Sequence, residues 1–405
     1  MRKSADHSPS LLVFMFLILP FGIMAGYLSV TLAYLFSKAG ISIEEVAGLV
    51  AASLIPQIFK FIWAPLVDIT LTVKKWHIIA TVISAACIFF TGIIPIKPAS
   101  LPLLTILILV SNVAVSFVSI AVNSFSAYDI EEEKKGRVSG FVQAGYMGGT
   151  GVGGGVGLWV AQNTAYQWMP GAVLATACLL SCIGLFFVKE PEITVRVTKL
   201  STTLRNVMQD VGTTLKTRNG LLGLILVLLP IGSCAANGLF AAIAKDWNAD
   251  VSIVALVTGV TGGLITGLGS LAGGWICDKM HKRTAYLFFG LAQVSCGLGL
   301  AFCTHTPTMF IIWTLLYSVT TGMAYAAYNA VTLEAIGKGA AATKFEIYAS
   351  VSNVPVYLMT FTEGIAYTKW GANGMLRYES LVAFTAIILF AGIQWMFNRQ
   401  KELRS

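Results

Sequence analysis

The stretch Trp63-Ala-Pro-Leu-Val-Asp68, with Lys74 and Lys75 behind it, occurs in a second form later in the chain. There, Gly274-Trp-Ile-Cys-Asp278 is followed directly by Lys279. In both copies an apolar run ends on an aspartate, basic residues follow, and the two aspartates (68 and 278) stand 210 positions apart. A motif that recurs at about half the length of the chain indicates two halves of related structure.

Long apolar runs surround both copies of the motif. Of the 405 residues, 56% are hydrophobic and 11% are charged, and the mean hydropathy is +0.77. Soluble domains carry about 25% charged residues, so this chain could not cover its surface in water. Apolar runs of about 20 residues cross a bilayer as helices, which satisfy their own backbone hydrogen bonds. The sequence predicts twelve spans, at 11–37, 43–66, 76–95, 101–128, 138–162, 168–188, 219–243, 251–275, 283–304, 307–334, 343–368 and 377–398.

The basic residues are distributed unequally between the two sides of the predicted bundle. Most of the 27 Lys and Arg residues fall in the two tails and in the loops on the same side as the tails. This excess is typical of the cytoplasmic side, so we expect both termini in the cytoplasm. The net charge of +8 thus reflects topology and predicts no nucleic-acid partner. The other side holds only Lys38, Lys97, Lys245, Lys369 and Arg377, and Lys60 lies within a span.

The longest polar stretch divides the spans into two sets of six. We expect an N-terminal six-helix half at 1–188, a cytoplasmic linker at 189–218 and a C-terminal six-helix half at 219–405. The halves also correspond where Asp129 and Glu334 end their spans. The predicted fold is therefore an all-α integral membrane protein with twelve transmembrane helices in two pseudo-symmetric six-helix halves. Such halves are typical of transporters that work by rocking.

The residues give little support for an enzyme or for a metal or cofactor site. All seven cysteines lie within apolar spans without a CxxC pair, and the four histidines lie in tails, loops or helix ends. A membrane-bound acyltransferase, the less favoured alternative, would need His/Asp, Ser/His or Cys/His residues converging at one interface. A GxGxxG match at Gly149, Gly151 and Gly154 lies inside a predicted span, where small residues let helices pack closely. We therefore expect no enzyme activity and no cofactor.

Several motifs resemble a known family. Gly274-xxx-Asp278-Lys279-xx-Lys282-Arg283 resembles the second copy of the major facilitator signature. Phe59-Lys-Phe-Ile-Trp63-Ala-Pro65-Leu-Val-Asp68 resembles a block of the AmpG-type muropeptide permeases and the related acetyl-coenzyme A transporters. The segments Tyr128-Asp129 to Gly136, Gly145-Tyr146 and Ala342-Thr343-Lys344-Phe345 resemble the same group, although Met147 stands where the muropeptide permeases lead us to expect arginine.

The resemblance implies a secondary transporter of the bacterial inner membrane. It implies a monomeric, proton-linked permease for a small polar or amphiphilic solute, such as a muropeptide, a siderophore or a coenzyme-like molecule. The solute would bind between two halves that open alternately to either side. A non-transporting solute sensor of the same fold is the alternative.

Charged residues near the predicted cytoplasmic helix ends are candidates for gating and coupling. A charge as deep as Lys60 is costly unless it is paired or hydrated, so we hypothesise an ion pair with Glu346 across the two halves. Asp68 and Asp278 can each face a helix N-terminus in the other half, where the helix dipole favours a carboxylate. The full set of gating and coupling candidates is Lys60, Asp68, Asp129, Arg137, Asp278, Glu334 and Glu346.

Polar and aromatic residues within the spans are candidates for binding the solute. In the architecture that the resemblance implies, the first, fourth, seventh and tenth spans line a central cavity, and the fifth borders it. A neutral, aromatic, hydrogen-bonding pocket would suit a sugar-like solute. The substrate-binding candidates are Tyr27, Thr31, Tyr34, Asn112, Asn123, Gln143, Tyr146, Asn237, Tyr325, Tyr328 and Asn329.

Overall fold

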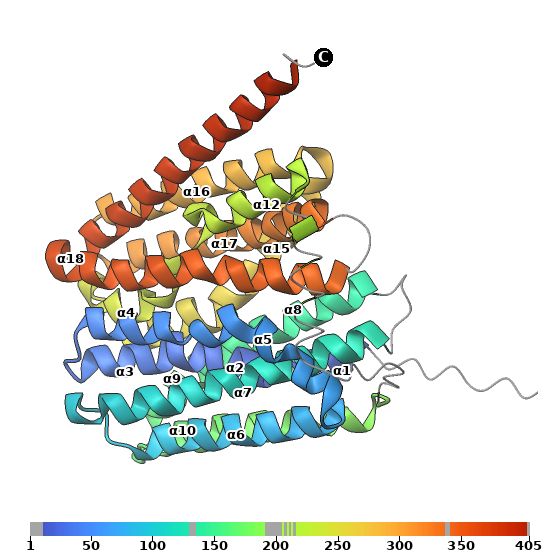
Figure 1. Ribbon diagram of the computed structural model, residues 1–405. Coiled ribbons are helices and arrows are strands. Elements are labelled where there is room, and N and C mark those ends of the chain that lie inside the picture. The colour runs from blue at the N-terminus through green and yellow to red at the C-terminus, as the bar shows by residue number, and fades with distance from the viewer. Residues whose placement is uncertain are drawn as a thin grey trace, which may run out of the picture.

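The computed structural model describes residues 11–128, 135–190, 205, 209, 212–213, 216–336 and 341–402. All regular secondary structure in this part of the chain is helical. The helices from blue to green gather in the lower part of Figure 1, and those from yellow to red gather in the upper part. We call these groups the first bundle (11–186) and the second bundle (218–402).

The first bundle crosses from end to end six times. Several crossings consist of consecutive helical pieces, and two contain a π-helical turn. The crossings are α1 (Leu11–Leu17), α2 (Leu19–Gly26), η1 (Tyr27–Leu32) and α3 (Ala33–Lys38); α4 (Ile43–Ala52) and α5 (Ile55–Ile69); α6 (Val73–Ile93); α7 (Leu101–Tyr128); α8 (Lys135–Gly151), η4 (Val152–Val156) and α9 (Gly157–Asn163); and α10 (Met169–Ser181) with η5 (Cys182–Phe186).

The second bundle repeats this plan with one interrupted crossing. Its crossings are α12 (Arg218–Leu228), η6 (Pro230–Gly232), η7 (Ala235–Gly238), α13 (Phe240–Ile243) and η8 (Ala244–Trp247); α14 (Val251–Val254), η9 (Ala255–Val260) and α15 (Thr261–Lys279); α16 (Lys282–Phe302); α17 (Pro307–Ile336); and the two arms of α18 (Ala341–Glu402).

Local sequence explains where these helices begin and break. Ser42 caps α4 with a full capping box, in which the Ser42 hydroxyl accepts from the Glu45 backbone N–H and the Glu45 carboxylate accepts from the Ser42 backbone N–H, so two free N–H groups at the start of the helix are satisfied. Pro230 lacks a backbone donor, and the helix that began at Arg218 ends just before it. The two arms of α18 meet at Gly371, whose φ of 67° favours glycine.

The predicted membrane spans are present in the described part of the chain. Nine segments there are long and apolar enough to cross a membrane, and one of them, Ile347–Phe397, holds both arms of α18. The crossing of α8 to α9 and the interrupted crossing that begins with the short apolar helix Arg218–Leu228 complete the predicted twelve. The all-helical membrane architecture expected from the sequence is thus confirmed.

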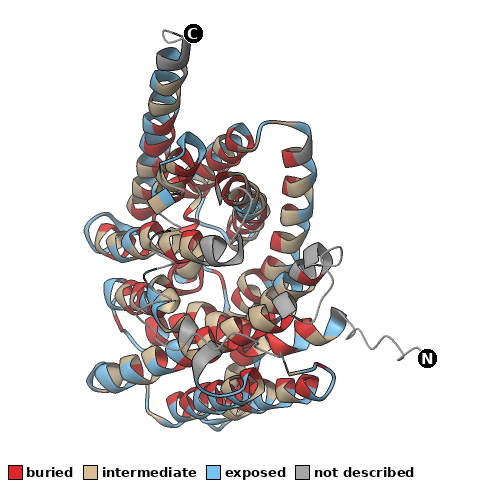
Figure 2. Cartoon of the chain, turned by 45° about the vertical axis from the view of Figure 1, so that its right-hand side comes forward, coloured by how far each residue is buried: buried red, intermediate tan, exposed pale blue. Residues whose placement is uncertain are grey.

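The outer surface of the bundle is apolar. Leu264, Leu268, Leu271 and Trp275 form a stripe along α15, and Leu271 is 74% exposed. Figure 2 shows exposed residues along the outer helix faces and buried ones where helices pack. A water-exposed surface would not carry such a stripe, whereas lipid accommodates it.

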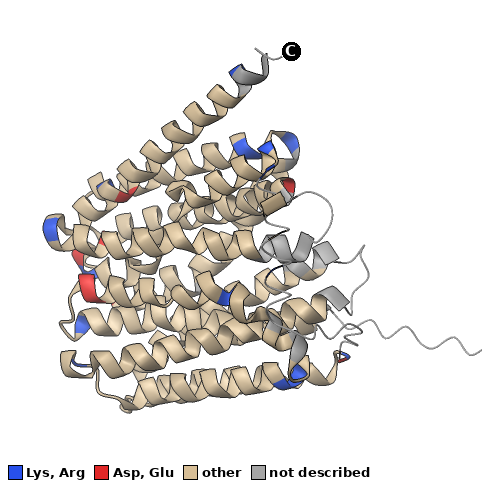
Figure 3. Ribbon diagram, in the orientation of Figure 1, with Lys and Arg blue, Asp and Glu red and all other residues tan. Residues whose placement is uncertain are grey.

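Charged residues lie mainly at the two ends of the bundle, as Figure 3 shows. We call the end that carries Lys74, Lys189, Arg218 and Lys279 the basic end, and the opposite one the far end. The proposed linker at 189–218 begins at the basic end, and most of it lies outside the described residues.

Several glycines in the runs at 148–157 and 259–274, and Gly26 and Gly322 opposite them, serve packing within one bundle. A Cβ on Gly26 would lie 2.0 Å from the Thr150 carbonyl oxygen, so the first and fifth crossings touch backbone to backbone. A Cβ on Gly322 would lie 2.0 Å from the Thr266 carbonyl oxygen in the second bundle. These glycines thus fix helices of the same bundle together.

A smaller set of contacts joins the two bundles toward the far end. A Cβ on Gly259 would lie 2.7 Å from Cα of Gly155, and one on Gly364 would lie 2.4 Å from Cβ of Ala47. The Ser37 hydroxyl also donates to the Ala242 carbonyl at 2.9 Å. Further toward the basic end, a Cβ on Gly267 would meet nothing within 4 Å. The fifth and eighth crossings are therefore in contact where Gly155 meets Gly259, and they have moved apart by Gly267.

Candidate functional site

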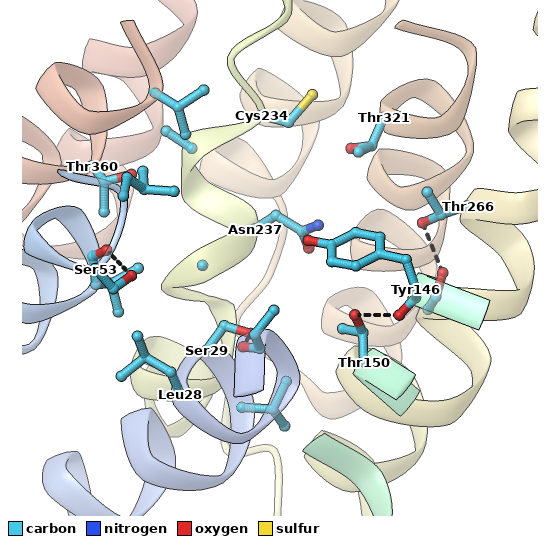
Figure 4. Close-up of a pocket in the computed structure, with 18 of the residues that line it drawn as sticks. Leu28, Ser29, Ser53, Tyr146, Thr150, Cys234, Asn237, Thr266, Thr321 and Thr360 are labelled. Atoms are coloured by element: carbon cyan, nitrogen blue, oxygen red, sulfur yellow. Dashed lines mark hydrogen bonds between the residues drawn. The ribbon is translucent and has the colours of Figure 1, made fainter. Parts of the chain in front are cut away.

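A cavity of about 240 Å³ lies between the two bundles (Figure 4). Eight of the crossings contribute to it, four from each bundle. Its polar lining residues are Ser29, Ser53, Gln57, Asn112, Tyr146, Thr150, Ser233, Cys234, Asn237, Thr258, Thr266, Ser318, Thr321, Tyr325, Asn353 and Thr360.

Hydroxyl and amide groups dominate the chemistry of this cavity. None of the described residues that line it carries a charged side chain. Many hydroxyls are already committed, since Ser53 donates to the Val50 carbonyl and Thr266 to the Gly262 carbonyl. Gln57 differs, because its Nε2 is buried and has no hydrogen-bond partner among the described residues. A buried amide without a partner is costly, so a bound molecule would satisfy it.

Two side chains from opposite bundles face one another inside the cavity. Tyr146 comes from α8 and Asn237 from η7, and Figure 4 shows the Tyr146 ring reaching toward the Asn237 amide. The Tyr146 ring packs against Phe21 with centroids 5.1 Å apart. Thr150 donates to the Tyr146 carbonyl at 3.0 Å. The first bundle therefore holds the Tyr146 ring in place, and the tip of the ring points into the cavity between the bundles.

The interrupted seventh crossing exposes backbone to this cavity. Cys234 has left-handed backbone angles (φ 50°, ψ 34°), and the residues around it form short 3₁₀ turns. Ser233, Cys234 and Asn237 all line the cavity. Irregular backbone at membrane depth is tolerated where it lines a cavity, and ligand sites are commonly built there.

Four of the substrate-binding candidates line the cavity, namely Asn112, Tyr146, Asn237 and Tyr325. Others face elsewhere: the Tyr27 hydroxyl hydrogen-bonds Thr91 at 3.1 Å, and the Thr31 hydroxyl donates to the Gly153 carbonyl at 2.8 Å. Gln143 and Asn329 are exposed outside it. The remaining three, Tyr34, Asn123 and Tyr328, are partly buried and are not among its lining residues.

No substrate-binding candidate came from the second, eighth or eleventh crossing, although all three line the cavity. Ser53 and Gln57 stand one turn apart, as Asn353, Val356 and Thr360 do, so each set shares a helix face. Polar residues one helical turn apart within an apolar span were the signal in the sequence that these helix faces line a cavity.

Of the gating and coupling candidates, only Lys60 and Glu334 have side chains among the described residues. Asp129 lies outside the described residues, as do the side chains of Asp68, Arg137, Asp278 and Glu346. Lys60 is half-buried on α5, one turn from Gln57 toward the basic end.

Glu334 pairs within its own bundle. Its Oε1 lies 3.1 Å from an Arg283 nitrogen, and the same nitrogen donates to Oδ1 of Asn219 at 2.9 Å. This cluster joins the beginnings of α12 and α16 to the end of α17.

Comparisons with known proteins agree with this architecture. The chain shares 24% identity over 310 residues with the anhydromuropeptide permease of Escherichia coli K12, covering 73% of this chain and 62% of the permease. The chain thus spans about three fifths of that relative's length. The partially occluded, inward-open structure of the E. coli xylose transporter XylE matches with a TM-score of 0.71 and 14% identity, covering 94% of this chain and 97% of that one.

The nucleoside transporter NupG matches with a TM-score of 0.72 and 12% identity, covering 94% of this chain and 98% of that one. The family profile of the Major Facilitator Superfamily matches residues 12–360. That match covers most of the chain and agrees with the twelve crossings and the cavity between two bundles. The protein is therefore a multi-pass membrane transporter of a small solute, not an enzyme, and it belongs to the major facilitator superfamily.

Proposed function

We propose that this chain moves a solute with a neutral sugar part through the central cavity by alternating access, coupled to protons. The observation that supports this most is the lining of the cavity, where hydroxyl and amide groups from both bundles converge and no described side chain is charged. Such groups recognise the hydroxyls and amides of sugars by hydrogen bonding. They offer no counter-charge to an anionic or cationic solute.

The size of the cavity and the relatives agree with a sugar. Its volume of about 240 Å³ is below the about 300–1,000 Å³ of pockets for drug-sized ligands, so it suits one sugar ring or the sugar end of a longer molecule. The permease at 24% identity is named for anhydromuropeptide, which joins a sugar to a peptide, and the sugar part would occupy the cavity. Met147 lines the cavity at the position where the resemblance to the muropeptide permeases implies arginine, which favours a neutral group of the solute at this point.

We also propose the orientation and division expected from the sequence. The basic end would face the cytoplasm of a bacterial cell, with both termini there, and the halves 1–188 and 219–405 would rock about the cavity as a monomer. The contacts of Gly259 and Gly364 close the far end, so this state would open inward.

Cysteine labelling tests the orientation. Lys97 and Lys189 are exposed at opposite ends of the bundle. In intact cells we expect a membrane-impermeant maleimide to label Lys97→Cys at once and Lys189→Cys only after permeabilisation. The reverse order would mean that the basic end faces outward.

Uptake into proteoliposomes tests the function. The panel would contain an anhydromuropeptide, xylose, uridine, a siderophore and acetyl-coenzyme A, each with and without an imposed pH gradient. We expect gradient-driven accumulation of a sugar-bearing member. Uptake that ignores the gradient would refute proton coupling, whereas binding without uptake of any member would favour a sensor.

Replacing Gln57 tests whether the cavity is the binding site. We expect Gln57→Met to weaken solute binding about twofold to tenfold, because a neutral hydrogen bond contributes about 0.5–1.5 kcal/mol. The unfolding temperature should stay the same or rise, since the variant removes a buried amide without a partner. Asn163→Ala removes an exposed amide at the end of α9 and should leave binding unchanged. Equal binding by Gln57→Met and the wild type would place the site elsewhere.

A further inference from the structure

Two carboxylates are buried in α18, one on each side of its bend at Gly371. Glu363 is 0% exposed and Glu379 is 5% exposed. A carboxylate inside a membrane protein is costly and marks a candidate functional site. The central cavity contains neither residue among its lining, so its chemistry leaves both unexplained.

The two carboxylates have different hydrogen-bond environments. Oε1 of Glu379 accepts a hydrogen bond from the Tyr317 hydroxyl at 2.6 Å and one from the Ala236 backbone N–H at 3.3 Å. Neither oxygen of Glu363 has a partner among the described residues. An ionised carboxylate is strongly disfavoured without partners in an apolar interior, whereas two donors suit the ionised form. The environment of Glu363 therefore suits its neutral form, whereas the two donors at Glu379 suit its ionised form.

A small cavity lies between Glu379 and the central cavity. Its volume is about 10 Å³, and Glu379, Gln293 and Ser380 contribute to its lining. Nε2 of Gln293 is buried there without a partner among the described residues. This space is close to the about 10–15 Å³ needed for one water, and its polar groups could hold that water. Ser233 and Cys234 line both cavities, so they separate Glu379 from the central cavity by one layer of residues.

The groups around the pair come from several helices. Tyr317 of α17 donates a hydrogen bond to Glu379, and Cys234 of the seventh crossing lines the small cavity together with Glu379. On α16, the Tyr286 hydroxyl lies 2.9 Å from the Cβ position of Gly232, which belongs to the same crossing as Cys234. On α4, Cα of Glu44 lies 3.0 Å from the Cβ position of Gly364, but its side chain is exposed.

We propose that Glu363 and Glu379 form the proton-binding site that couples the pH gradient to solute movement, with Glu379 exchanging its proton through the small cavity. This inference rests on the proposed transport function. A proton passes from water in the central cavity to the water beside Glu379 and then to its carboxylate. Protonation weakens the hydrogen bond that Glu379 accepts from Ala236, in the segment that also carries Asn237. Solute binding and proton binding thus act on the same interrupted helix, and linkage makes their effects reciprocal.

A proton suits this site better than a sodium ion. Sodium is a hard cation that requires several oxygen ligands, whereas Glu379 already faces two donors, the Tyr317 hydroxyl and the Ala236 N–H. These donors would repel a cation. A space of about 10 Å³ also leaves little room for a hydrated ion.

The experiment uses the full chain in lipid and two independent readouts. Infrared spectroscopy across a pH titration, with the proton as the only ligand, should show a carboxylic acid band in the wild type that is reduced in both Glu363→Gln and Glu379→Gln. In proteoliposomes with an anhydromuropeptide as the probe, both variants should lose about tenfold or more of gradient-driven accumulation and retain counterflow exchange. Glu379→Asp should restore part of the accumulation, and Glu45→Gln, which alters an exposed helix cap, should match the wild type.

The outcomes separate this inference from the proposed function. If the wild type lacks the infrared band, or if both Gln variants keep it unchanged, the pair does not bind the proton. Wild-type accumulation by both variants would also overturn the coupling role. If the wild type shows the titrating band and the variants lose it, but the anhydromuropeptide is not accumulated, the proton site stands and the proposed solute is wrong. Thermal unfolding of each variant shows that it is folded.

Discussion

Gly259→Leu should reduce transport about tenfold or more while leaving the protein folded. The Cβ of any larger residue at 259 would lie 2.7 Å from Cα of Gly155, which is backbone and cannot move aside. Overpacking of this kind costs about 1–3 kcal/mol. In a protein with two states, that cost shifts their ratio by about 5- to 150-fold. We expect the variant to favour the state in which the far end is open.

Reactivity of a cavity cysteine measures this shift directly. Cys234 lines the central cavity, so a chain that retains it as the only cysteine reports access from the far side. Gly259→Leu should increase its labelling by an impermeant maleimide added at that side. Gly267→Leu, on the same helix where a Cβ would meet nothing within 4 Å, should not. Equal labelling of the two variants would show that the contact of Gly155 with Gly259 does not close the far end.

The glycine runs show how far a sequence pattern specifies its contacts. Runs at 148–157 and 259–274 predicted close helix packing, and the structure contains it. The pattern did not reveal that some of these glycines, such as Gly153 and Gly269, join helices of the same bundle, while Gly155, Gly259 and Gly263 join the two bundles. Small residues allow close approach with any neighbour, so the partner is decided by the tertiary fold.

The length of the apolar runs made the membrane spans predictable, but it did not predict the irregular segments within them. The break between 343–368 and 377–398 was expected and lies at Gly371. Within the predicted span at 219–243 the helix stops before Pro230 and continues as short turns, and the apolar pattern does not indicate the extent of this irregular segment. In the π-helical turn η1 (Tyr27–Leu32), Ser29 lines the cavity, while Tyr27 and Thr31, two residues to either side, face their own bundle.

The order of the spans placed the binding candidates on the right helices but not on the right helix faces. Asn112 and Asn123 both lie on α7, and Tyr325 and Asn329 both lie on α17, but only the first of each pair lines the cavity. Glu379 was not among the candidates, since one polar residue in an outer span gives no periodic signal. Its importance follows from its contacts with Tyr317 and Ala236, which are 62 and 143 positions away in the chain.

Arg283→Met should cause the largest loss of stability among single substitutions at the basic end. Arg283 is 6% exposed, and one of its terminal nitrogens bonds both Asn219 and Glu334. Removal of one partner from a buried ion pair costs about 3–5 kcal/mol. We expect the lower end of that range, because the Glu334 side chain is 27% exposed and keeps contact with solvent. Thermal unfolding of the purified protein in detergent measures the loss, and Lys282→Met, which changes the neighbouring half-exposed residue, should change little.

A double variant decides whether the loss reflects the ion pair or the packing around it. If the cost of Arg283→Met is the charge left on Glu334, then Arg283→Met combined with Glu334→Leu should recover much of the stability, because apolar replacement of both partners is often neutral. Arg283→Met, Glu334→Leu and the double variant together complete a double-mutant cycle, which gives the coupling energy between the two side chains. Additive losses would mean that the two side chains act independently. Coupling would mean that Arg283 holds α12, α16 and α17 together at the basic end, where the second bundle must move as one body if the halves rock.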